Sequence, residues 1–146
     1  MKRRGLRLSR RHQLVLYGAS VLLFLSGAAW AWANHLDETA PAMESVRQFK
    51  PWLLKIHGFS AMGFVLLLGT LVPGHIRRGW NADKNRTNGA FFLAVVGLLA
   101  LSGYMLYYLG SETWRNATSQ CHLWLGLAAP ALLLWHIRTG RAATKS

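Results

Sequence analysis

Residues 52–72 read WLLKIHGFSAMGFVLLLGTLV, an apolar stretch whose only charged or ionisable side chains are Lys55 and His57. About 20 predominantly apolar residues are enough for a helix to cross a bilayer. Pro73 and Gly74, which follow directly, end or kink a helix. The stretch therefore predicts a transmembrane helix over 52–72.

Three other apolar stretches have the same character. Residues 14–33 and 90–109 contain no charged side chain, and residues 121–137 contain none apart from two histidines. The last stretch spans a membrane only if the polar residues before it are helical too, and Ser111 with Glu112 is a typical helix start. We expect an all-α, integral membrane four-helix bundle in one domain. Its helices are predicted at about 13–33, 52–72, 90–110 and 113–138 of residues 1–146.

The distribution of the basic residues predicts how the helices are oriented. The formal net charge is +12, yet apart from Lys55 the charges are confined to segments between the apolar stretches. Arginine and lysine gather in residues 1–12, 77–86 and 138–146, which share one side of a membrane if four helices alternate in direction. Because basic loops stay in the cytoplasm, we expect an up-down-up-down topology with both termini cytoplasmic, in a bacterial inner membrane. Topology explains the charge without a nucleic-acid partner.

The first apolar stretch also has features of a secretory signal, with a basic start and an Ala31-Trp32-Ala33 triplet. Its apolar run is longer than a usual signal core, and large tryptophans crowd the cleavage position. We therefore expect an uncleaved helix. We also expect no internal repeat.

Four histidines lie in or beside two of the predicted helices, where ionisable side chains usually mark a functional site. His57 and His75 lie at the two ends of one helix, and His122 and His136 lie near the two ends of the last. At about 100° per residue, each pair lies on nearly one helix face. Alternating helices would bring His57 to His122 on the outer side and His75 to His136 on the inner side. Two facing neutral imidazoles give the six-coordinate iron of an electron-transfer haem.

The two pairs differ in spacing, which leaves two other ligands open. At about 1.5 Å per residue, His57 and His75 lie roughly 27 Å apart along a helix, whereas the pair on the last helix lies roughly 21 Å apart. A fold-back at Pro73 and Gly74 would remove this difference. Otherwise His12 would be the inner ligand, and His35 is a spare ligand on the outer side.

Small and basic residues near the histidines are candidates for haem contact. Gly58 and Gly126 would leave room for a flat porphyrin, although small residues also let membrane helices approach without a cofactor. Basic side chains at the helix ends would neutralise haem propionates or serve only as interface anchors. The basic candidates are Lys55, Arg77, Arg78 and Arg115.

Cys121 directly precedes His122, as in a covalent c-type haem site. The second cysteine of that motif is replaced by Thr118, so we expect b-type haem and a helix-packing or free thiol, with a single-cysteine thioether as the open alternative. The sequence contains no phosphate-binding loop, and no nucleophile with a base and an orienting group. Electron relay is therefore expected rather than catalysis by side chains.

The chain resembles the bacterial four-helix di-haem b-type membrane cytochromes, a cytochrome b561-like group that includes the cytochrome b subunits of hydrogenase and formate dehydrogenase. The matching residues are Lys55-Ile56-His57-Gly58, Pro73-Gly74-His75-Ile76-Arg77-Arg78-Gly79-Trp80, Ser102-Gly103-Tyr104, Tyr107-Tyr108, Cys121-His122 and His136. The resemblance implies two b haems stacked across the bilayer, with His57, His75, His122 and His136 as ligands. It also implies electron exchange with a quinone, a periplasmic cytochrome or flavoprotein, or a partner oxidoreductase subunit.

Two functions of other classes remain open at this point. A haem-free membrane anchor or assembly subunit would use the histidines only for packing and partner contact, and would be colourless when purified. A transporter would need a discontinuous helix, and Pro73 lies too near a helix end to provide one.

Overall fold

The computed structural model describes residues 8–39, 44–82 and 85–143, which form helices and short connections without any strand. The four long helices are α1 (Arg10–Thr39), α2 (Glu44–Leu71), α4 (Arg86–Tyr108) and α5 (Glu112–Ala143). Two short elements, the π-helix η1 (Val72–Ile76) and α3 (Arg77–Asn81), follow α2 without a break. The predicted all-α fold class is confirmed. Several basic residues used to predict orientation lie outside the described residues: those of segment 1–7, Lys84 and Lys145.

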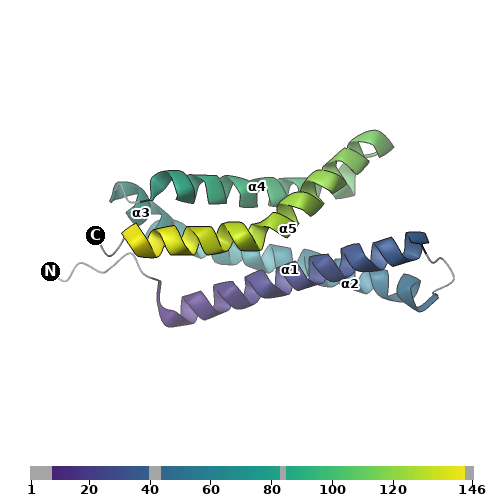
Figure 1. The fold of residues 1–146 in the computed structure, drawn as a ribbon, viewed down its shortest axis with the longest axis horizontal. Coiled ribbons are helices and arrows are strands. Elements are labelled where there is room, and N and C mark those ends of the chain that lie inside the picture. The colour runs from purple at the N-terminus through teal and green to yellow at the C-terminus, as the bar shows by residue number, and fades with distance from the viewer. Residues whose placement is uncertain (1–7, 40–43, 83–84, 144–146) are drawn as a thin grey trace.

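The long helices alternate in direction along the chain (Figure 1). α1 packs along α2, α4 packs along α5, and a smaller contact joins α1 to α5. The molecule therefore consists of two helical hairpins, α1–α2 and α4–α5. The start of α1, the end of α5 and α3 lie together at one end, which we call the basic end because it carries Arg10, Arg77 and Arg141.

Three helical segments are long and apolar enough to cross a membrane: Arg10–Asp37, Glu44–Asn81 and Arg86–Tyr108. Few hydrophobic side chains of the described residues are buried, whereas many large ones on these segments are exposed, among them Leu66, at 68%. This distribution is typical of helices that face lipid. α5 is also long, but its apolar part begins only at Cys121, after a mostly polar segment from Glu112 to Gln120.

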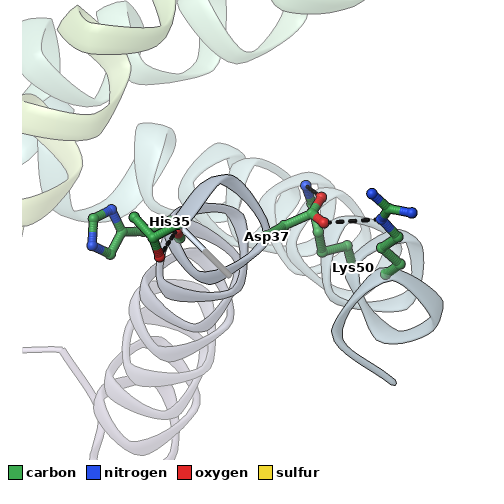
Figure 2. A network of polar contacts seen from close by, with 5 residues as sticks. His35, Asp37 and Lys50 are labelled. Atoms are coloured by element: carbon green, nitrogen blue, oxygen red, sulfur yellow. Dashed lines mark hydrogen bonds and ion pairs between the residues drawn. The ribbon is translucent and has the colours of Figure 1, made fainter. Parts of the chain in front are cut away.

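The connection between the first two helices is shorter than the loop predicted over 34–51. α1 continues to Thr39 and α2 already begins at Glu44, so these two predicted helix boundaries were wrong. Pro51 lies within α2, and Pro41 lies outside the described residues. Figure 2 shows the contacts that join the two extensions: Asp37 accepts hydrogen bonds from Lys50 Nζ at 2.6 Å and from Arg47 Nε at 3.1 Å.

The second helix does not end at Pro73. The π-helical turn η1 contains Pro73, Gly74 and His75, and α3 continues from it. A π turn bonds residue i to residue i+5, so it accommodates an extra residue, and such turns are frequent at functional sites. The helix continues through η1 into α3, so the chain does not fold back at Pro73 and Gly74 as the histidine spacing had suggested. α5 contains Pro130 and is bent along its length (Figure 1).

Candidate functional site

The first histidine pair lies toward the end of the molecule opposite the basic end. His57 of α2 and His122 of α5 have ring centroids 6.1 Å apart, with ring planes at 89°. Both residues are half-buried. Two residues separated by 65 positions in the chain thus meet, as the helix faces predict.

The second pair lies toward the basic end. His75 of η1 and His136 of α5 have ring centroids 6.4 Å apart, with ring planes at 83°. Phe92 of α4 stacks on His136, with ring centroids 5.2 Å apart and ring planes at 12°. The pairing of all four histidines therefore agrees with the one predicted from helix periodicity.

Hydrogen bonds define which nitrogen carries the proton in two of these imidazoles. The Nδ1 atom of His57 donates to the Leu23 carbonyl at 3.1 Å, and Nδ1 of His136 donates to Asn88 Oδ1 at 2.6 Å. A carbonyl oxygen can only accept, so the proton lies on Nδ1. The lone pair then lies on Nε2, the nitrogen left to bind a metal.

Serine hydroxyls lie against the outer pair. Ser26 Oγ lies 3.2 Å from Nδ1 of His57, and Ser102 Oγ lies 2.9 Å from Nδ1 of His122. Both serines are buried, at 6% and 8% exposure. A buried hydroxyl with a partner beyond its own helix is unusual in an apolar span, and here both partners are the candidate ligands.

Glycines let these rings approach the neighbouring helices. A Cβ atom at Gly27 of α1 would lie 2.8 Å from Cε1 of His57, and one at Gly103 of α4 would lie 3.2 Å from Cε1 of His122. The two glycines selected from the sequence have other neighbours. A Cβ at Gly58 would meet the Tyr107 hydroxyl at 3.5 Å, and one at Gly126 would meet Leu99 at 3.9 Å.

The basic candidates all lie on exposed helix surfaces; they are Lys55, Arg77, Arg78 and Arg115. The ammonium of Lys55 lies 4.6 Å from the ring centroid of Trp52, one turn earlier. The guanidinium of Arg78 donates to the Gly74 carbonyl at 2.6 Å. These two side chains therefore contact residues of their own helical segment.

The two alternative ligands are exposed residues of α1. His12 lies in the first turn, where its Nδ1 is 3.0 Å from the Ser9 hydroxyl. The ring of His35 lies 6.4 Å from that of Trp32, and Figure 2 shows it directed away from Asp37 and Lys50. The paired arrangement thus uses the other four histidines of the chain.

Sequence reasoning missed Ser26, Ser102 and Asn88, the side chains that hold the imidazoles. A signal for the serines is present, because Leu-x-Leu-Ser-Gly occurs at 23–27 and again at 99–103. Asn88 has no comparable signal. It is 8% exposed, and its Nδ2 atom is buried without a partner among the described residues.

The geometry of the pairs suits an iron held between two imidazoles. Metal–imidazole bonds of about 2 Å on both sides of an iron would put the ring centroids roughly 6 Å apart. The observed separations are 6.1 and 6.4 Å. Within the described ranges, no three His, Cys, Asp or Glu side chains gather at one point. A two-imidazole set is what a six-coordinate haem takes from a protein. Cys121, beside the outer pair, is a free and exposed thiol.

The fold and the site together define a helical protein with three segments of membrane-spanning character and two pairs of facing imidazoles. Comparison of the chain with protein-family models, with curated proteins and with solved structures finds no match. The function is therefore argued from the geometry of the chain itself.

Proposed function

We propose that the chain is a di-haem b-type cytochrome that relays electrons across a bacterial inner membrane. All four long helices cross the bilayer, with both termini in the cytoplasm. The outer haem binds between His57 and His122, and the inner haem binds between His75 and His136. The observation that carries the proposal is the presence of two facing imidazole pairs at two levels of one helical structure.

The helix arrangement supports this assignment. α2 with η1 and α5 supply all four histidines, yet α2 packs chiefly on α1, and α5 packs chiefly on α4. The two ligand-bearing helices thus belong to different hairpins. A haem between the hairpins would be held at each level by one histidine of α2 or η1 and one histidine of α5.

The protein residues have three tasks in this mechanism. His57, His122 and His136 would present Nε2 to a bound haem because their Nδ1 atoms are engaged in hydrogen bonds, and the surrounding helices would limit the access of water. Burial and hydrogen bonding then set the redox potential. A bound haem supplies the one-electron chemistry itself. The donor and acceptor would be a quinone, a periplasmic cytochrome or flavoprotein, or a partner oxidoreductase subunit.

The first test is the dithionite-reduced minus oxidised spectrum of the detergent-purified protein, with haem quantified per polypeptide. We expect the wild type to contain two b haems. His57→Ala or His122→Ala should remove one, and His75→Ala or His136→Ala should remove the other. His12→Ala and His35→Ala, which change exposed histidines outside both pairs, are the matched controls and should retain both haems.

Two outcomes would contradict the proposal. Loss of haem in the His12→Ala control, with retention in His75→Ala, would reassign the inner ligand. A well-folded but colourless wild type from haem-replete cells would leave a haem-free membrane anchor or assembly subunit as the function.

A further inference from the structure

The two outer histidines are held by the same set of contacts from two different hairpins. In the first hairpin, Ser26 of α1 lies against His57 of α2. In the second, Ser102 of α4 lies against His122 of α5. In both cases the next residue of the first helix is a glycine whose added Cβ would touch Cε1 of the same ring. Each contact thus has a counterpart in the other hairpin.

The hydroxyl protons follow the same pattern. Ser26 Oγ donates to the Leu23 carbonyl at 3.0 Å, and Ser102 Oγ donates to the Leu99 carbonyl at 3.1 Å. Since its only proton is used in this way, each serine oxygen can accept from the Nδ1–H of its histidine, and in His57 this N–H is shared between Ser26 Oγ and the Leu23 carbonyl. His57 and His122 therefore present Nε2 for the same reason.

The amino-acid sequence shows that this likeness extends along both hairpins. Leu-Leu-x-Leu-Ser-Gly occurs at 22–27 in α1 and at 98–103 in α4. His-Ile-Arg-x-Gly occurs at 75–79, after α2, and at 136–140 in α5. In each hairpin, the serine and glycine lie in the first helix, and one outer and one inner histidine lie in or directly after the second. The chain has the organisation of a duplicated two-helix unit.

We propose that the outer pair is formed by two copies of one Ser-Gly/His unit, and that Ser26 and Ser102 are its positioning residues. Each hydroxyl fixes the rotation of its imidazole and raises the electron donation of Nε2 to the iron. The inference rests on the proposed haem function and deepens it. An acceptor on Nδ1–H makes an imidazole a more basic ligand, which stabilises oxidised iron and lowers its potential.

The inner pair does not share this unit. His136 donates to an amide oxygen, Asn88 Oδ1, and stacks on Phe92. The two haems therefore have different hydrogen-bonding environments within one duplicated framework. A change at either serine is expected to act on the outer haem alone.

The experiment compares Ser26→Ala, Ser102→Ala and the double variant with the wild type. Ser20→Ala is the matched control, because Ser20 lies on the same helix as Ser26 and its hydroxyl bonds the Leu16 carbonyl. The readouts are haem per polypeptide, the midpoint potential of each haem, and the low-spin electron paramagnetic resonance signals. The outer haem is identified as the one that His57→Ala removes.

We expect each single variant to keep both haems, to raise the outer midpoint potential and to change the outer resonance signal. The double variant should show a larger shift than either single variant. The potential and signal of the inner haem should not change in any variant, and Ser20→Ala should leave both haems as in the wild type. Ser26→Thr and Ser102→Thr retain a hydroxyl that bonds a carbonyl of the preceding turn, and should restore wild-type values.

Three results would overturn the inference. In the first, the midpoint potential and the resonance signal of the outer haem in both alanine variants equal those in Ser20→Ala. This result would show that the hydroxyls do not act on the iron. Loss of the outer haem in alanine and threonine variants alike would reduce the serines to packing residues. A colourless wild type would remove the haem function itself, whereas the first two results leave it intact.

Discussion

Gly27 has less room for a side chain than any other glycine whose surroundings are described. Its added Cβ would lie 2.8 Å from Cε1 of His57, closer than real Cβ contacts allow, whereas the Cβ at Gly103 would lie 3.2 Å from Cε1 of His122. A methyl group at either position must move an imidazole. Substitution of these two glycines is therefore expected to disturb the outer histidine pair, and more strongly at Gly27 than at Gly103.

We predict that Gly27→Ala loses most of the outer haem and that Gly103→Ala loses less of it, while the inner haem is retained in both. Haem per polypeptide and the reduced spectrum measure the loss. The matched controls are Gly18→Ala in α1 and Gly97→Ala in α4, where an added Cβ meets nothing within 4 Å. Equal haem content in all four variants would contradict the close approach of the rings.

At the residue scale, the pairing of the four histidines could be predicted from the sequence, but the side chains that contact their rings were not predicted. The histidines are recognisable because ionisable side chains are rare in membrane spans and because their spacing follows the helix period. Ser26 and Ser102 lie in apolar stretches where a serine ordinarily bonds its own helix. Only the packing of α1 on α2, and of α4 on α5, shows that they reach a histidine.

At the scale of the element, Pro73 does not end its helix as a proline usually does, because it lies in the π turn η1. The proline has no N–H to donate and its ring crowds the carbonyl of the preceding turn. The π turn accommodates both effects and lets the helix continue, carrying His75 toward His136. The position of His75 along the helix and its rotation about the helix axis both depend on this turn.

We predict that Pro73→Ala lowers the occupancy of the inner haem by at least half and leaves the outer haem in place. Alanine restores the N–H donor and favours regular α-helix, so the extra residue of the π turn is no longer accommodated and His75 rotates away from His136. Haem per polypeptide, with the potential of the remaining haem, measures the change.

Pro51→Ala is the matched control for Pro73→Ala. It replaces a proline within a long helix, outside the π turn. Pro51→Ala should keep both haems. Full inner occupancy in Pro73→Ala would show that the π turn does not position His75.

The helix ends were the least predictable part of the elements. Residues 34–39 and 44–51 are polar and include Pro51, so the sequence pattern indicates a loop. The structure shows helix there, and Asp37 bonds Lys50 and Arg47 across the two helices. A contact between helices is invisible to local propensity. By contrast, α5 begins at Glu112, directly after Ser111, as its capping residues predict.

At the scale of the whole molecule, the topology depends on whether α5 crosses the membrane. The three segments of membrane-spanning character lie in α1, in α2 with its continuation, and in α4. If α5 crosses as well, its polar first turns lie outside and its end returns to the side where α1 begins. Cys121, the one cysteine of the chain, lies at the boundary between those polar turns and the apolar part.

We predict that a membrane-impermeant maleimide labels Cys121 from the outer face of intact spheroplasts. In the control, Cys121→Ser is combined with Ala142→Cys, which moves the thiol to an exposed position at the end of α5. This variant should react only after the membrane is permeabilised. Labelling of both positions from the same face would show that α5 does not cross.

The position of α5 as the last of the four helices has a consequence for how the protein is made. His122 and His136 both lie in α5, whereas their partners emerge from the ribosome much earlier. Under the proposed ligation, the outer pair is complete only after translation has passed residue 122, and the inner pair only after residue 136. Binding of haem by both histidines of a pair would then occur only after that part of α5 is synthesised. A chain released before α5 would hold no low-spin haem at either level.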